Sequence, residues 1–154
     1  MSLDQAVLQV ELRQLPDATL PARITVHKDD TVTLNGDFGT AHARLTRFQS
    51  RELQSLAGLL DLKASFKQYG DPDETAAIIA EVSVAYRKPQ KDLVLCWDHH
   101  PRDPEKRAEY QRTKLLVKRV AGMARELQWN STPAQSYTSA IYNYLNSSGQ
   151  PASP

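Results

Sequence analysis

The chain is 154 residues long, which fits one domain with a substantial hydrophobic core. Its 19 Lys and Arg residues nearly balance its 18 Asp and Glu residues, so the whole molecule has no strong field that would attract nucleic acid or an anionic membrane. A single cysteine excludes an intrachain disulfide, and no apolar run approaches the roughly 20 residues that cross a bilayer. The first residues lack the basic and apolar regions of a secretion signal. We therefore expect a cytoplasmic protein without a membrane partner.

The first third of the chain predicts a small antiparallel meander. Residues 8–12 and 24–26 alternate between apolar and polar side chains, which is the period of a half-buried strand. Residues 28–30 predict a reversal between two adjacent strands. Asn35-Gly36 predicts a second tight turn because both residues tolerate positive φ, and residues 41–45 then predict a weaker third pairing.

The remainder predicts two helices around a hairpin. Ser50 is a candidate N-cap for a short amphipathic helix whose leucines share one stripe. Residues 77–97 contain the longest alternating pattern, interrupted by a turn, and predict the central hairpin of the sheet. Asp103 followed by Pro104 is a strong helix-start signal, and the apolar period continues to about Trp129. This pattern predicts a long helix with one apolar face.

These elements predict an α+β fold in two layers, with a mainly antiparallel sheet and one short and one long amphipathic helix packed on one face. Residues 1–132 form the expected single domain. Residues 133–154 are rich in Ser, Thr, Asn, Gln and Pro and are predicted to be a polar C-terminal extension, partly docked or disordered. Tyr137, Ile141 and Tyr144 lie at near-helical spacing in it, so a short aromatic helix could cover the chain's own core or bind a partner.

The densest chemistry lies at the end of the predicted hairpin, in Cys96, Asp98, His99 and His100. These residue types suit zinc or another borderline metal, with His27 or His42 completing a site across the sheet, and they suggest a metal-dependent hydrolase as an alternative function. Successive strand residues point to opposite faces, however, so contiguity favours a polar loop between strand and helix. Cys96 then packs as a small buried hydrophobe. We accordingly expect no cofactor.

A basic ridge is predicted on the long helix at residues 104–128. Arg107, Lys114, Lys118 and Arg125 line a stripe nearly opposite the apolar one. Such a ridge could contact phosphates, so nucleic-acid binding is a second alternative function. It lacks the interleaved aromatic residues that stack on bases, and a cationic outer face also keeps a helix soluble.

An ordered set of spaced apolar and turn residues runs through residues 21–129. It comprises Pro21-x-x-Ile24-x-Val26, Asp29-Asp30-Thr31-Val32, Gly36, the helix of Leu53, Leu56 and Leu60, Phe66-x-x-Tyr69, Asp73-x-Thr75, the hairpin of Val82, Val84, Leu93 and Leu95, and the helix ending at Trp129. This layout resembles small bacterial α+β domains of unassigned function and the emfourin-type inhibitors of thermolysin-like proteases. The resemblance implies an α+β fold and an inhibitory role, and carries over no functional residue. Asp30 stands where a turn glycine would be expected.

The sequence offers no set of nucleophile, base and orienting group that would indicate catalysis. We therefore expect a non-enzymatic protein-interaction module with an unknown partner, and an inhibitor- or immunity-like role is the most specific form of that hypothesis. The sheet edge, the loops and the basic ridge are the surfaces from which such a module would bind.

Overall fold

The computed structural model describes residues 5–16, 18, 20–60 and 67–147, and over these residues the chain forms one seven-stranded sheet and three helices. The strand order is β4-β3-β2-β1-β6-β7-β5, and every neighbouring pair is antiparallel except β5 and β7. The strands are β1 (Ala6–Arg13), β2 (Ala22–His27), β3 (Thr31–Gly36), β4 (Gly39–Arg44), β5 (Gln68–Tyr69), β6 (Ile79–Val84) and β7 (Lys91–Cys96). The helices are α1 (Arg47–Gly58), α2 (Pro104–Glu126) and α3 (Thr132–Ser147).

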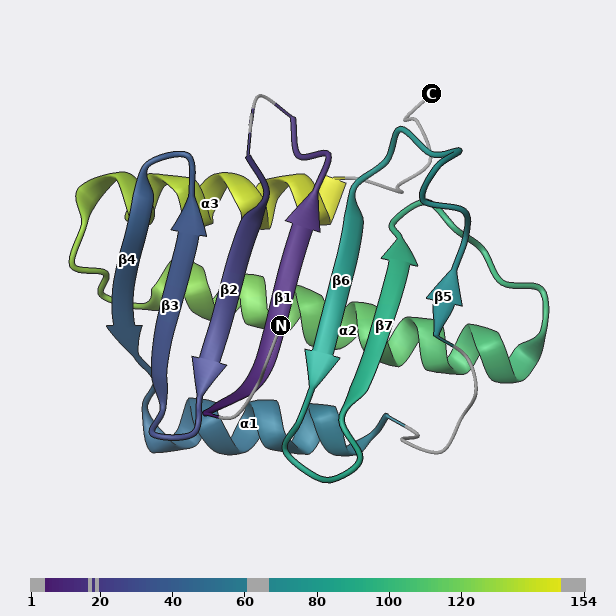
Figure 1. Ribbon diagram of the computed structural model, residues 1–154, viewed down its shortest axis with the longest axis horizontal. Coiled ribbons are helices and arrows are strands. Elements are labelled where there is room, and N and C mark those ends of the chain that lie inside the picture. The colour runs from purple at the N-terminus through teal and green to yellow at the C-terminus, as the bar shows by residue number, and fades with distance from the viewer. Residues whose placement is uncertain (1–4, 17, 19, 61–66, 148–154) are drawn as a thin grey trace.

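All three helices lie on the same side of the sheet, behind it in Figure 1. The core fills the space between the two layers. In β1, Leu8, Val10 and Leu12 point toward the helices and are almost completely buried, while the residues between them lie on the other face. Leu116 and Val120 of α2 meet them from the opposite side of the core. The two-layer α+β prediction is confirmed.

The start of the long helix is as predicted, whereas the start of the short one is not. The Asp103 side chain accepts hydrogen bonds from the backbone N–H groups of Glu105 and Lys106, as expected of an N-cap. The short helix α1 begins after Thr46 because Thr46 and Gln49 cap each other's backbone reciprocally. Ser50 is instead a buried residue inside α1, and its hydroxyl donates to Asp30 Oδ1 at 2.6 Å.

The predicted turn at Asn35-Gly36 is also displaced. Both residues belong to β3, Gly36 pairs with Gly39, and residues 37 and 38 form the turn. A Cβ atom on Gly36 would lie 2.7 Å from the Tyr137 ring, so glycine here permits the close approach of α3 rather than the reversal. The hairpin of β6 and β7 is formed as expected but lies off-centre, because β1 pairs with both β2 and β6 and occupies the middle of the sheet.

Helix α3 lies in the predicted C-terminal extension, where the spacing of Tyr137, Ile141 and Tyr144 indicated a short aromatic helix that could cover the chain's own core. Ala134, Ile141 and Leu145 are buried in the same core as the strands. Tyr137 packs edge-on against Phe38, with the ring centroids 5.3 Å apart, and Tyr144 packs partly buried against the core. Residues 148–154 of the predicted extension, and Phe66 of the pattern above, lie outside the described residues.

The two outer strands of the sheet, β4 and β5, differ in length and contacts. On β4, the backbone N–H of His42 donates to Asn130 Oδ1 at 2.9 Å, and the His42 carbonyl accepts from the Asn130 N–H at 3.2 Å. At the other end, β5 contains only Gln68 and Tyr69 and runs parallel to β7. Sequence analysis missed β5 because two residues are too few to show alternation.

Candidate functional site

One face of the sheet carries no helix (Figure 1), and most of the side chains that β1, β2 and β3 place on it are polar. The alternation that sends apolar side chains into the core sends the intervening ones to this uncovered face. Strand register aligns six of them in one row that crosses the sheet. In order from β4 to β7, the row is His42, Thr33, Thr25, Gln9, Ser83 and Asp92. Four of these six side chains are hydroxyl or amide groups, and a fifth is the imidazole of His42. The row is therefore well suited to hydrogen bonding.

Bonds between strands hold this face in place. Glu11 on β1 pairs with Arg23 on β2 at 2.7 Å, and Arg13 on β1 pairs with Glu81 on β6 at 2.8 Å. The Thr25 hydroxyl lies 3.4 Å from Gln9 Oε1. These contacts connect side chains of neighbouring central strands, so part of the face is arranged before any partner binds.

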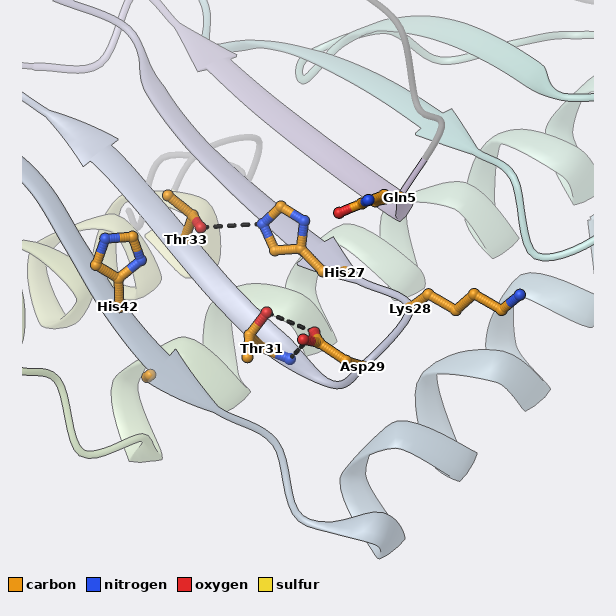
Figure 2. A pocket seen from close by; sticks show the side chains of 8 residues that line it. Gln5, His27, Lys28, Asp29, Thr31, Thr33 and His42 are labelled. Carbon is orange, nitrogen blue, oxygen red and sulfur yellow. Dashed lines mark hydrogen bonds between the residues drawn. The ribbon is translucent and has the colours of Figure 1, made fainter.

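A hollow of about 920 Å³ opens on the β2–β4 part of the face, and Figure 2 shows its lining. Thr33 lies between two imidazoles, with its Oγ1 3.0 Å from His27 Nε2 and with His42 as its register partner on β4. Asp29 turns toward its own turn, where it accepts from the Thr31 hydroxyl and backbone N–H. These hydrogen bonds hold the pKa of Asp29 below its usual value.

The predicted metal ligands lie at the other end of the sheet. Cys96, Asp98, His99 and His100 border a smaller hollow of about 290 Å³, together with residues of the loop after β5. Asp98 accepts a hydrogen bond from the Thr75 hydroxyl, and the His99 ring packs edge-on against Tyr110 at 5.9 Å. Within the described ranges, no three His, Cys, Asp or Glu side chains gather closely enough to hold a metal ion.

Two details of the expected metal site are settled by this placement. Cys96 is buried, and its burial raises the pKa of the thiol, which disfavours the reactive thiolate. His27 and His42 cannot complete a site with Cys96. The strands β1 and β6 separate β2 from β7, a distance of about 14 Å at ordinary strand spacing, and β4 lies farther still.

Gly70 beside this smaller hollow supports a stability prediction. It has a φ of +87°, and an added Cβ would lie 2.8 Å from Cys96 Cβ. Gly39 has a φ of +111° but open space around its Cβ position. We expect Gly70→Ala to lower the free energy of unfolding by about 1–3 kcal/mol more than Gly39→Ala, because only Gly70→Ala adds overpacking to backbone strain. Urea unfolding of both variants measures the difference, and equal losses would contradict the close packing of Gly70 on Cys96.

The residues of the predicted basic ridge mostly bond to their own chain. Arg107 donates to the Pro101 and Arg102 carbonyls. Lys114 donates to the Trp97 carbonyl and lies 4.7 Å from the centroid of the Trp97 ring, and its burial lowers the pKa of the ammonium group. Arg125 lies 3.9 Å from the centroid of the Tyr142 ring, and Lys118 is half-buried. Three of the four cations therefore support the packing of α2.

His27 and His42 were candidates to complete a metal site with Cys96, and the structure places them near Thr33 instead. The sequence does indicate that both histidines lie on the face away from the core, since each alternates with residues that face the core. What was missing was the register between strands, which places Thr33 beside each of them.

Comparison of the chain with protein-family models, with curated proteins and with solved structures gave no match. The resemblance to emfourin-type inhibitors thus remains a prediction. None of the helices in the described part of the chain is both long and apolar enough to span a membrane.

Proposed function

We propose that this chain is a protein-interaction module that binds its partner across the uncovered face of the sheet. The observation that carries the proposal is a polar face that spans the sheet, is held by bonds between strands, and is covered by no described helix. A surface whose side chains are already fixed loses little conformational freedom on binding, so more of its contact energy appears as affinity.

The chemistry of the face favours binding over catalysis. The hydroxyl that contacts an imidazole on the face is that of Thr33, 3.0 Å from His27 Nε2. Nucleophilic catalysis also needs a third group that orients the base, and among the described residues the imidazole of His27 has no such hydrogen bond. If the bound partner is an enzyme or a toxin, this function becomes an inhibitor- or immunity-like role.

Photo-cross-linking in the cells that make the protein tests the proposal. The photoreactive residue benzoylphenylalanine replaces Gln9 or Ser83, which lie side by side at the middle of the uncovered face. A matched variant carries it at Gln111, which is exposed on α2 on the other side of the molecule. We expect a discrete protein adduct from the two positions on the sheet and none from Gln111. Absence of an adduct from the sheet, or the same adducts from all three positions, would contradict the proposal.

A further inference from the structure

The two halves of the uncovered face carry opposite charge. Strands β2, β3 and β4 contain no Asp or Glu, and they place Arg23, His27, His42 and Arg44 on this face. Two carboxylates lie beside this half: Glu11 of β1 pairs with Arg23 at 2.7 Å, and Asp29, in the turn between β2 and β3, is held by Thr31.

The other half is acidic. Strands β6 and β7 place two carboxylates on the uncovered face, those of Glu81 and Asp92. The one basic residue of these two strands, Lys91, points into the core and is buried. The hollow beyond β7 adds Asp71, Glu74 and Asp98, beside His99 and His100.

The division of charge is arranged about the central strand. β1 has three strands on each side, and its Glu11 bonds to the basic half while its Arg13 bonds to the acidic half. A twofold axis along β1 therefore places the basic half of one copy over the acidic half of another. In that arrangement Thr33 faces Asp92 of the second copy across the shared row, and Arg23 faces Glu81 of the second copy.

The size of the face suits such a contact. Six strands of six or eight residues, at ordinary strand spacing and rise, cover roughly 600 Å² in flat projection, and β5 and the side-chain relief add to this. A stable protein–protein interface buries about 800 Å² on each partner.

We propose that the partner of the uncovered face is a second copy of this chain, docked face to face about a twofold axis along β1. The inference rests on the proposed function and names its partner. The basic half of each copy faces the acidic half of the other, which favours this orientation because the other face-to-face twofold orientation would place like halves together. Glu11 and Arg13 lie on the axis and face the same residues of the second copy, and their in-chain partners Arg23 and Glu81 offset these like charges.

Sedimentation equilibrium of the purified full-length chain tests the proposal. We expect a mass of twice the chain's 17.3 kDa at 50 mM NaCl, and a dissociation constant that increases at least tenfold at 500 mM NaCl as the charges are screened. A monomer at every concentration up to about 200 µM would overturn the proposal, since that limit corresponds to an affinity too weak for such an interface.

A charge exchange tests the orientation. Asp92→Lys and Thr33→Asp are each expected to weaken dimerisation at least tenfold, because Asp92→Lys places an ammonium group against the basic half of the second copy and Thr33→Asp places a carboxylate against Asp92. The double variant restores opposite charges and is expected to return to within about threefold of the unmodified chain. Arg112→Glu, an exposed change on α2, is the matched control and should have no effect. Circular dichroism and the unfolding midpoint confirm that each variant folds.

The outcomes separate this inference from the function on which it rests. If neither single variant changed the dissociation constant of the dimer, the dimer would use another surface and the inference would be overturned. A cross-linked adduct from Gln9 or Ser83 with a mass other than twice that of the chain would also overturn it, while leaving the proposed function standing. Absence of both the dimer and any adduct would overturn the two together.

Discussion

Replacing Glu109 with Leu is expected to lower the free energy of unfolding by about 3–5 kcal/mol, because it removes the carboxylate that pairs with the buried ammonium group of Lys91. Lys91 Nζ and Glu109 Oε1 lie 3.1 Å apart, and each side chain is only 4% exposed. Alternation in β7 places Lys91 on the core side with Leu93 and Leu95, where it is buried. Burial, together with the charge of Glu109, also raises the pKa of the neighbouring Tyr69 to about 12.

A double variant separates the net contribution of the ion pair to stability from the destabilisation caused by removing only one of its two charges. Lys91→Met with Glu109→Leu removes both charges and fills a similar volume, and we expect it to recover most of the loss. Urea unfolding followed by tryptophan fluorescence measures all three proteins. The exposed pair of Arg13 and Glu81 provides the control, since its side chains are 38% and 41% exposed and Arg13→Leu should cost less than about 1 kcal/mol. A loss below about 1 kcal/mol for Glu109→Leu would show that the pair is not buried in solution.

Replacing Trp97 with Ala is also expected to have a large effect, lowering the free energy of unfolding by about 3–5 kcal/mol. The Trp97 side chain is 0% exposed, and its indole N–H donates to the Leu145 carbonyl in the last turn of α3 at 3.0 Å. It is therefore a direct link between β7 and α3. Trp97→Phe keeps much of the packing and removes the hydrogen bond, so we expect about 1–3 kcal/mol for the unsatisfied carbonyl and the lost volume.

Hydrogen exchange provides a readout specific to α3. In Trp97→Phe, the backbone amides of α3 should exchange faster relative to those of α2, because the link at Leu145 is lost. Trp129→Phe is a matched control, since the Trp129 indole also donates to a carbonyl, that of Ala124, but within five residues of the same segment. Equal changes in α2 and α3 for Trp97→Phe would contradict a local role for this hydrogen bond.

Local signals in the sequence predicted the elements but not their arrangement. Alternation identified β1, β2, β6 and β7 because each has one buried and one exposed face, and Asp103 with Pro104 predicted the start of α2 from capping alone. The central position of β1 depends on which distant strands pair, and no local pattern carries that information. The polar composition after residue 132 obscured α3, whose narrow apolar stripe is completed by small residues such as Ala134.

The same limit explains the candidate site. Cys96 and its neighbours were the candidate site because reactive residue types are adjacent there in sequence. In the structure the Cys96 thiol is buried, and Asp98 and His99 contact different residues. The row across the uncovered face draws one residue from each of six strands. This row of side chains exists only once the strands are in register, so it could not be read from spacing along the chain.

The contact between Asn130 and the backbone of His42 has a consequence for how molecules of this protein can meet in concentrated solution. An outermost strand with unpaired amides is a template on which further chains can add without limit, as in fibrils. Here Asn130 already occupies the outward-facing amide and carbonyl of His42, and the strand at the opposite end is only two residues long. Open-ended polymerisation is thereby discouraged at both borders of the sheet.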